Sequence, residues 1–260
     1  MNDKIKSDYF SLELYKRTLL KAIQHGYVFP KISQLREVIN FPPKFLALRH
    51  DIDVSPINAL EMAKIEHEFG ITSSYYVLMH SLYYNPAAQP FVDALWEIIS
   101  LGFEVGLHYE ARFFEERNMD PLAGVLNDIA ALSHILGIEI KSVSQHNPAS
   151  STLLKELNKH YIDAYNNALV NEITYISDSG FKWRDKSLID LIPSHQKIHA
   201  LIHPTTWIYG DLDMEGTYRK CSLILQNMIG MEFESFIEST YHYLSRRDSL
   251  DKIRKSKYSE

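Results

Sequence analysis

Short apolar runs alternate along the chain with segments whose apolar residues recur at the helical period of about 3.6 residues. The apolar runs predict strands at residues 44–48 running on into 49–53, 72–79, 103–108 and 138–144, with less clear strands at 162–164, 173–177 and 198–203. The periodic segments predict helices at residues 8–24, 57–69, 90–101, 121–136 and 215–244. Strands and helices that alternate over short connections form βα units, so the sequence predicts a mainly parallel sheet.

Cap and turn residues mark the boundaries of several predicted helices. Ser55 and Pro56 suit the N-cap and the first turn of the helix that follows them. Three predicted helices are followed by a glycine, the residue type that most often ends a helix: Gly70, Gly102 and Gly137. Because the chain contains no internal repeat and no long linker, we expect one α/β domain over residues 1–260, with its core at about 44–210.

The composition narrows the class of protein. The chain has 260 residues, a formal net charge of −6 and one cysteine, Cys221, which excludes a disulfide framework and a cysteine-rich zinc module. The acidic balance argues against a nucleic-acid or anionic-membrane partner. The polar N-terminus lacks the apolar stretch of a signal peptide, and no window approaches the roughly 18 apolar residues of a membrane span. We therefore expect a cytoplasmic protein without a membrane span.

Ionisable side chains gather at the predicted carboxyl ends of the strands. Six of them follow or end a predicted strand: Asp51, Asp53, His108, His146, Asp178 and His203. In parallel α/β folds, binding and catalytic sites form at the carboxyl ends of the strands. We therefore expect these side chains to converge on one mouth of the sheet.

Asp51 and Asp53 are the first pair in this group. Side chains two residues apart on a strand share a face, about 7 Å apart by the strand rise. Two anions this close repel each other unless a cation or a proton lies between them. The alternative is that one of them caps the next helix, but Ser55 is better placed for that function.

The histidines at the other strand ends supply the matching ligand type. His108 and Asp53 together suit zinc or another divalent ion, although a lone histidine can also be a satisfied core residue. Glu110 is a further ligand, an acceptor that orients the imidazole, or a solvated loop carboxylate. His146 lies two residues before Pro148 and His203 directly before Pro204, and a residue that precedes proline is held in extended geometry.

Four motifs, in this order, resemble those of the polysaccharide deacetylase family, the chitooligosaccharide deacetylase homology domain. They lie at residues 48–53 (Leu-Arg-His-Asp-Ile-Asp), 102–108 (Gly-Phe-Glu-Val-Gly-Leu-His), 144–148 (Ser-Gln-His-Asn-Pro) and 201–204 (Leu-Ile-His-Pro). The resemblance extends over about residues 45–207. The segment 175–179, together with Trp183, is similar to members associated with lipopolysaccharide and capsule assembly.

The resemblance implies a distorted (β/α) barrel of about seven strands and metal-assisted removal of an N-acetyl group from a sugar. By position, Asp51 corresponds to the general base and His203 to the general acid, while Asp53 and His108 correspond to ligands of a divalent metal, expected to be zinc. We place Asp178 with the catalytic group, where it holds His203 or Asp51 or binds a sugar hydroxyl.

Two departures from the family pattern concern the metal. The family places a second metal histidine where this chain has Arg112, which cannot bind a cation, and an arginine where this chain has His146. One hypothesis explains both changes: His146 supplies the missing imidazole, so that Asp53, His108 and His146 bind the metal. The competing hypothesis is that the metal and the activity are lost.

Substrate contacts are expected around the mouth. The candidates are Glu110, Arg112 and three aromatic residues of predicted loops, Tyr84, Trp183 and Trp207, whose rings either stack on a sugar or pack the loops onto the barrel. We expect a nucleotide-linked or lipid-linked sugar of envelope polysaccharide or lipopolysaccharide biosynthesis. The alternatives are a small-amide or ureide hydrolase and a non-catalytic sugar-binding protein. The helices at 8–24 and 215–244 are expected to pack on the barrel. The alternative for the helix at 215–244 is that it forms a homodimer contact.

Overall fold

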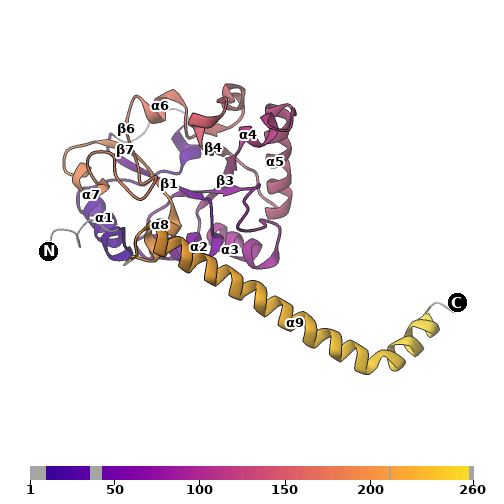
Figure 1. Cartoon of the computed structure of the whole chain (residues 1–260). Coiled ribbons are helices and arrows are strands. Elements are labelled where there is room, and N and C mark those ends of the chain that lie inside the picture. Colours follow the sequence, from indigo (N-terminus) through magenta and orange to yellow (C-terminus); the bar gives the residue numbers. More distant parts are fainter. Residues whose placement is uncertain (1–9, 36–42, 211, 258–260) are drawn as a thin grey trace. The chain divides into compact units, whose positions relative to one another are not determined.

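The computed structural model describes residues 10–35, 43–210 and 212–257 and is built on one sheet of seven parallel strands (Figure 1). The strands are β1 (Phe45–Ile52), β2 (Ser74–Leu78), β3 (Glu104–Tyr109), β4 (Ser142–Gln145), β5 (Ile162–Asp163), β6 (Thr174–Ser177) and β7 (Lys197–Ile202). Their order in the sheet is β5-β4-β3-β2-β1-β7-β6, and every pair is parallel. This is the circular order of a (β/α) barrel opened between β5 and β6, which confirms the predicted α/β fold of a distorted seven-stranded barrel.

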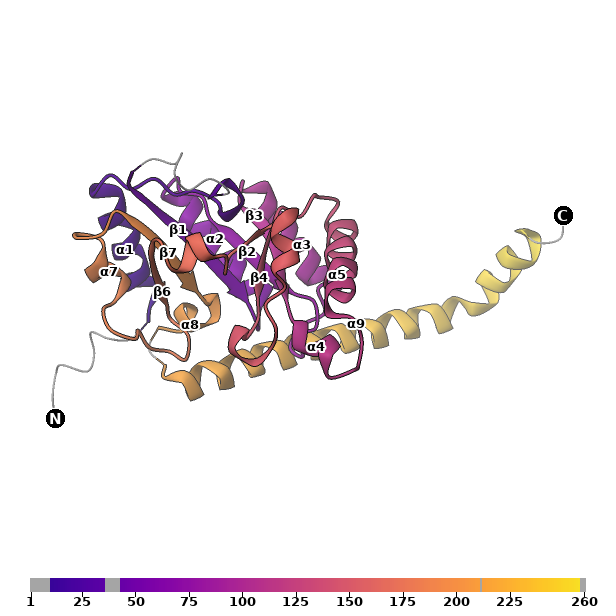
Figure 2. The same cartoon turned by 90° about the horizontal axis from the view of Figure 1, so that it is seen from above.

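Helices surround the curled sheet (Figure 2). The predicted ones are present as α1 (Leu12–Gln24), α2 (Pro56–Glu68), α3 (Gln89–Ser100) and α5 (Pro121–Leu136). Sequence periodicity did not predict the short helices α4 (Ala111–Glu115), α6 (Asn167–Val170), α7 (Leu188–Leu191) and α8 (Pro204–Ile208), or the 3-10 turns Ile32–Leu35, Pro148–Ser150 and Lys155–Lys159. Segments of one turn are too short to show a helical period.

Two elements, α1 and β4, begin later in the chain than the sequence predicted, because capping residues set where helices begin and end. Helix α1 begins after its N-cap Ser11, and residues 8 and 9 of the predicted helix lie outside the described residues. Strand β4 begins at Ser142 instead of residue 138, because Ile138 is used to end α5. Gly137 takes a left-handed conformation, and the Ile138 amide donates to the carbonyl of Ser133 at 3.2 Å.

Strand β1 is buried on both faces and organises two cores. Leu46 and Leu48 pack toward helices α1 and α2, whereas Phe45 and Ala47 pack in a separate cluster with residues of β2 and β5. By the same alternation, Arg49 shares a face with Asp51. Strand β1 thus brings polar side chains inward from the interior of the sheet.

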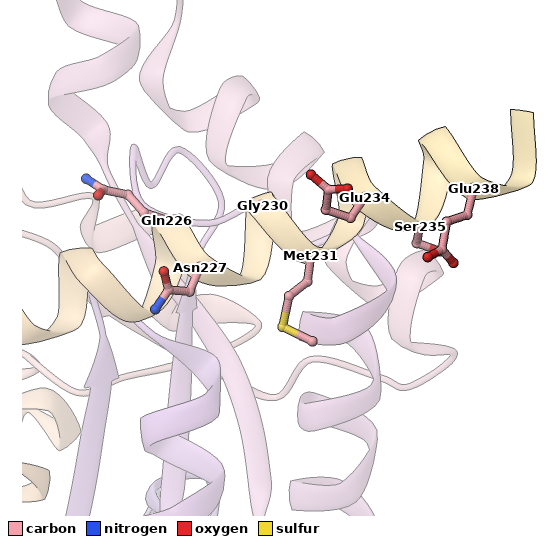
Figure 3. A pocket seen from close by; sticks show the side chains of 7 residues that line it. All are labelled: Gln226, Asn227, Gly230, Met231, Glu234, Ser235 and Glu238. Atoms are coloured by element: carbon pink, nitrogen blue, oxygen red, sulfur yellow. The ribbon is translucent and has the colours of Figure 1, made fainter. Parts of the chain in front are cut away.

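The chain divides into two compact units, Met1–Thr217 and Tyr218–Glu260. The second contains most of α9 (Met214–Lys257), which is the predicted helix 215–244 continued to Lys257. Figure 3 shows its stretch from Gln226 to Glu238, where Met231 stands beside polar and acidic side chains of the same helix. The prediction that residues 1–260 form a single domain, with this helix packed on the barrel, stays a prediction.

Within residues 10–35, 43–210 and 212–257, no helix is both long enough and apolar enough to cross a bilayer.

Candidate active site

The ends of strands β1, β3, β4 and β7 bring predicted site residues to one end of the sheet. Asp51 lies near the end of β1 and Asp53 just after it, while His108 lies in β3. His146 follows β4 directly, and its amide donates to the carbonyl of Tyr109 at 2.7 Å, which extends the β3–β4 pairing by one residue. Because β4, β3, β2, β1 and β7 are consecutive in the sheet, the expected convergence occurs.

Asp51 is held by a buried arginine. Nε and Nη2 of Arg49 lie 3.0 and 2.6 Å from the two oxygens of Asp51, and both side chains are almost fully buried. The Ser144 hydroxyl lies 3.2 and 3.3 Å from the same oxygens. Burial alone would raise the pKa of the Asp51 carboxyl, but the Arg49 guanidinium outweighs it and holds that pKa well below its usual range.

Sequence reasoning did not assign a role to Arg49 or Ser144. The signal for Arg49 was present, because residues 49 and 51 alternate onto the same face of a strand. The predicted apolar run ended at Leu48, however, which left Arg49 at a strand exit instead of inside β1. Ser144 carries no such signal, since its partner lies on another strand.

His108 is oriented by the backbone of β4. Its Nδ1 lies 2.9 Å from the carbonyl oxygen of Ser144, and a carbonyl only accepts, so Nδ1 carries a proton. In the neutral ring, Nε2 then carries a lone pair, and this nitrogen lies 3.2 Å from Oδ1 of Asp53 and 3.5 Å from Oδ2 of Asp51. A lone pair this close to two carboxylates requires a proton or a metal ion between them.

Asp53, His108 and His146 form a possible metal site. Each offers one ligand atom, and these atoms lie within 4.8 Å of one another. Oδ1 of Asp53 and Nδ1 of His146 are buried, and neither has a hydrogen-bond partner among the residues that the structure describes. Their nearest charged neighbours are His108 Nε2, 3.2 Å from Asp53 Oδ1, and Glu110 Oε1, 3.4 Å from His146 Nδ1. Buried polar atoms normally form hydrogen bonds, so two ligand atoms that lack one, beside a third, fit a divalent cation.

The loop after β4 sets the position of His146. The next residue, Asn147, has a left-handed backbone (φ 46°), a conformation that asparagine tolerates. The rings of His146 and His108 lie 5.1 Å apart between centroids. Oε1 of Glu110 lies 3.4 Å from Nδ1 of His146, and the contact with His146 lowers the pKa of the Glu110 carboxyl.

His203 forms a second unit with Asp178. Its Nδ1 lies 2.6 Å from Oδ1 of Asp178, and its backbone amide donates to Oδ2 at 2.9 Å. Burial alone would lower the pKa of His203, but the Asp178 carboxylate raises it to about 9. Nε2 of His203 faces Oδ2 of Asp53 at 3.7 Å. Asp178 was expected to hold His203 or Asp51 or to bind a sugar hydroxyl, and its contacts are those of a residue that holds His203.

The predicted substrate contacts differ in their surroundings. Arg112 is exposed on α4 and pairs with Glu116 at 2.6 Å. Trp207 is 1% exposed and donates from Nε1 to Asp178, while Tyr84 is buried and donates to the carbonyl of Ile52 at 2.7 Å. Rings buried in this way have no free face for a sugar. Trp207 and Tyr84 therefore pack the loops onto the barrel, which was the alternative to stacking on a sugar.

Glu110 lies at the surface of the site, and Trp183 lies beside Trp207, whose indole contacts Asp178. Trp183 is half-buried and packs on Phe10, with ring centroids 5.3 Å apart, so part of its ring is open to solvent. Glu110 is one-quarter exposed beside His146. These two side chains keep the accessibility that a substrate contact needs.

Solved structures similar to the chain include two deacetylases. The Streptococcus pyogenes deacetylase PplD, in complex with acetate, has a TM-score of 0.45 and 14% identity over 74% of this chain and 81% of its own. The Bacillus subtilis peptidoglycan deacetylase PdaC has a TM-score of 0.44 and 15% identity over 80% of this chain and 99% of its own, and a mutant of PdaC has a TM-score of 0.43 at the same identity and coverage. No family model and no curated protein matches the sequence.

Proposed function

We propose that this protein is a metal-dependent hydrolase that removes an N-acetyl group from a sugar. The observation that carries the proposal is the group formed by Asp53, His108 and His146, whose ligand atoms lie within 4.8 Å of one another and include two buried atoms without hydrogen-bond partners among the described residues. The resemblance of the four motifs to polysaccharide deacetylases supports an acetylated sugar as the substrate class.

The three residues match the ligand requirement of a catalytic zinc, which is three protein groups and an open position. When bound, such an ion supplies a water of lowered pKa, about 7, and polarises a carbonyl oxygen. The tautomer of His108, fixed by the Ser144 carbonyl, presents Nε2 to this position. His146 takes the place of the second metal histidine of the family pattern, whose position is occupied by Arg112 in this chain.

Asp51 and His203 are suited to the two proton transfers of amide hydrolysis. Asp51 stays ionised because of Arg49, so it can accept a proton from the attacking water. His203 is an imidazolium at neutral pH, and Asp178 retains the proton on its Nδ1. The proton on Nε2 is therefore the one that His203 donates to the departing amine.

The substrate proposed here is a nucleotide-linked or lipid-linked N-acetyl sugar in envelope polysaccharide or lipopolysaccharide biosynthesis, in the cytoplasm. Support comes from the segment 175–179 with Trp183, which resembles members associated with that assembly. The accessible part of the Trp183 ring gives a sugar a surface on which to stack.

Metal analysis combined with acetate release tests the proposal. Purified protein is expected to contain about one zinc per chain and to release acetate from at least one of a panel of nucleotide-activated N-acetyl sugars. His146→Ala is expected to weaken zinc binding about 100-fold or more, since losing even an outer partner of a ligand costs about 10–100-fold. The matched control is His134→Ala, which removes an exposed histidine on α5.

Each outcome of this experiment has a defined meaning. Zinc content that is unchanged in His146→Ala would rule out His146 as a ligand. Zinc binding without acetate release from any sugar would favour the small-amide hydrolase, and protein that binds no metal would favour the non-catalytic alternative.

A further inference from the structure

We propose that Arg49 is a positioning residue for the reaction, which fixes the orientation of the Asp51 carboxylate toward the reacting atoms. This inference rests on the proposed function, because it gives Arg49 a role only through Asp51. Nothing in the motif resemblance assigns a role to Arg49. The structure points to it by three independent observations: geometry, burial and a covering ring.

The geometry restricts Asp51 in all directions. Arg49 contacts both oxygens, through Nε at 3.0 Å and Nη2 at 2.6 Å, so the carboxylate cannot rotate without breaking one of these contacts. The Ser144 hydroxyl lies within 3.3 Å of both oxygens and comes from β4, across the sheet from β1. A two-point contact from a planar guanidinium defines the plane of the carboxylate as well as its distance.

Burial makes this contact strong and makes its loss costly. Arg49 is 0% exposed and Asp51 is 2% exposed, so water cannot replace either partner. An ion pair in a low-dielectric environment is much stronger than the same pair in water, and an unpaired buried charge is strongly unfavourable. Asp51 therefore has one stable arrangement as long as Arg49 is present.

A ring from the edge of the sheet covers the guanidinium. Cζ of Arg49 lies 4.3 Å from the ring centroid of Tyr165, which follows β5 beside the opening of the barrel. A flat guanidinium stacks on such a ring, whereas the compact ammonium of lysine cannot combine stacking with a two-point contact. The site thus requires an arginine at this position and not merely a positive charge.

Arg49→Lys separates positioning from charge. We expect kcat to fall about 10–100-fold, with KM and zinc content close to wild type, because a small displacement of a catalytic group costs up to about 100-fold. Arg17→Lys, at an exposed position on α1, is the matched control and is expected to change nothing. Two results for Arg49→Lys would overturn the positioning role. One is a kcat within about twofold of wild type, and the other is a fall in kcat that matches the fall in zinc content.

Tyr165 provides a second pair of variants. Tyr165→Phe keeps the ring over Arg49 and is expected to leave kcat within about threefold, whereas Tyr165→Ala removes the ring and is expected to lower kcat by about tenfold. Equal effects of the two substitutions would show that the ring does not act through Arg49.

A readout without substrate distinguishes the two proposals. In urea unfolding, a double-mutant cycle of Arg49→Met and Asp51→Asn is expected to show a coupling of at least about tenfold in the unfolding equilibrium constant. Additive effects in this cycle would overturn the Arg49–Asp51 contact itself. If wild-type protein released no acetate from any sugar, the proposed function would fail together with the catalytic role of Arg49, whereas wild-type kcat in Arg49→Lys would overturn only the positioning role.

Discussion

Two carboxylates, the buried Glu66 and the partly exposed Asp53, differ in how their oxygens are hydrogen-bonded. Glu66 of α2 lies on the helix side, where its Oε1 contacts His50 Nε2 at 2.7 Å and the Tyr15 hydroxyl, and its Oε2 accepts from Ser73 and Tyr75 at 2.5 and 2.8 Å. All four acceptor positions of Glu66 are used. This carboxylate ties α1, α2, β1 and β2 together.

Asp53, on the inner side, is the contrasting case. Its Oδ1 is buried and has no hydrogen-bond partner among the described residues, although His108 Nε2 lies 3.2 Å away. A buried carboxylate that is saturated stabilises the fold, whereas one that is left unsaturated costs free energy. Glu66 thus has the contacts of a structural residue, and the open acceptor of Asp53 supports the proposal that Asp53 binds a metal ion.

The largest expected effect concerns the neighbour of Asp53 in the site. Asp51→Asn removes the proton acceptor, so turnover is expected to fall by about 10²–10⁴-fold while zinc content stays at the wild-type value. Steady-state acetate release and metal analysis of the same preparation measure both quantities. Full activity of Asp51→Asn would remove Asp51 from the role of base.

The contrast between Glu66 and Asp53 is tested by replacing each carboxylate with the matching amide in metal-free protein. Glu66→Gln is expected to lower the free energy of unfolding by about 2–3 kcal/mol, because it disrupts several hydrogen bonds to a buried charge. Asp53→Asn is expected to lower that free energy by less than Glu66→Gln does. It weakens the contacts of a partly exposed carboxylate with His108 and His203, but it also removes one of two neighbouring anions. Urea unfolding measures both values, and the reverse order would contradict the assignment of roles.

The pH dependence of stability probes the His203–Asp178 pair. The pKa of His203 is raised to about 9 in the folded protein, against about 6.5 in an unfolded chain. Its stabilising contribution is therefore fully present below about pH 6.5 and is lost as pH rises through about 9. Asp178→Asn is expected to make the free energy of unfolding less dependent on pH between about 6.5 and 9. It is also expected to move the alkaline loss of turnover to lower pH. A variant with the wild-type pH profile would show that Asp178 does not set the pKa of His203.

The smallest effect is expected at the surface. Arg112 pairs with Glu116 one turn away, and both side chains are more than half exposed. Arg112→Ala is expected to change the free energy of unfolding by no more than about 0.5 kcal/mol. A rise in KM with unchanged kcat would establish Arg112 as a substrate contact, and unchanged kinetics would remove it from that group.

The sequence predicted the fold and the convergence of the site better than its internal contacts. Periodicity identified the three long βα units, and the rule that sites lie at strand ends selected residues that the sheet does bring together, such as Asp53 and His108. These features depend on local patterns repeated over many residues.

What could not be predicted depends on contacts between distant segments. The Ser144 hydroxyl that contacts Asp51 and the Ser144 carbonyl that orients His108 both come from another strand. The burial of Trp207 depends on its packing against Phe10 and Tyr15 of the N-terminal segment. No single stretch of sequence contains this information.

A crystal structure of the zinc-loaded protein tests the central claim most directly. The account predicts one zinc ion with ligand distances of about 2.0–2.2 Å to Asp53, His108 and His146, with Asp51 beside the ion and still held by Arg49. A zinc ion bound without His146, or no zinc at this end of the sheet, would contradict it.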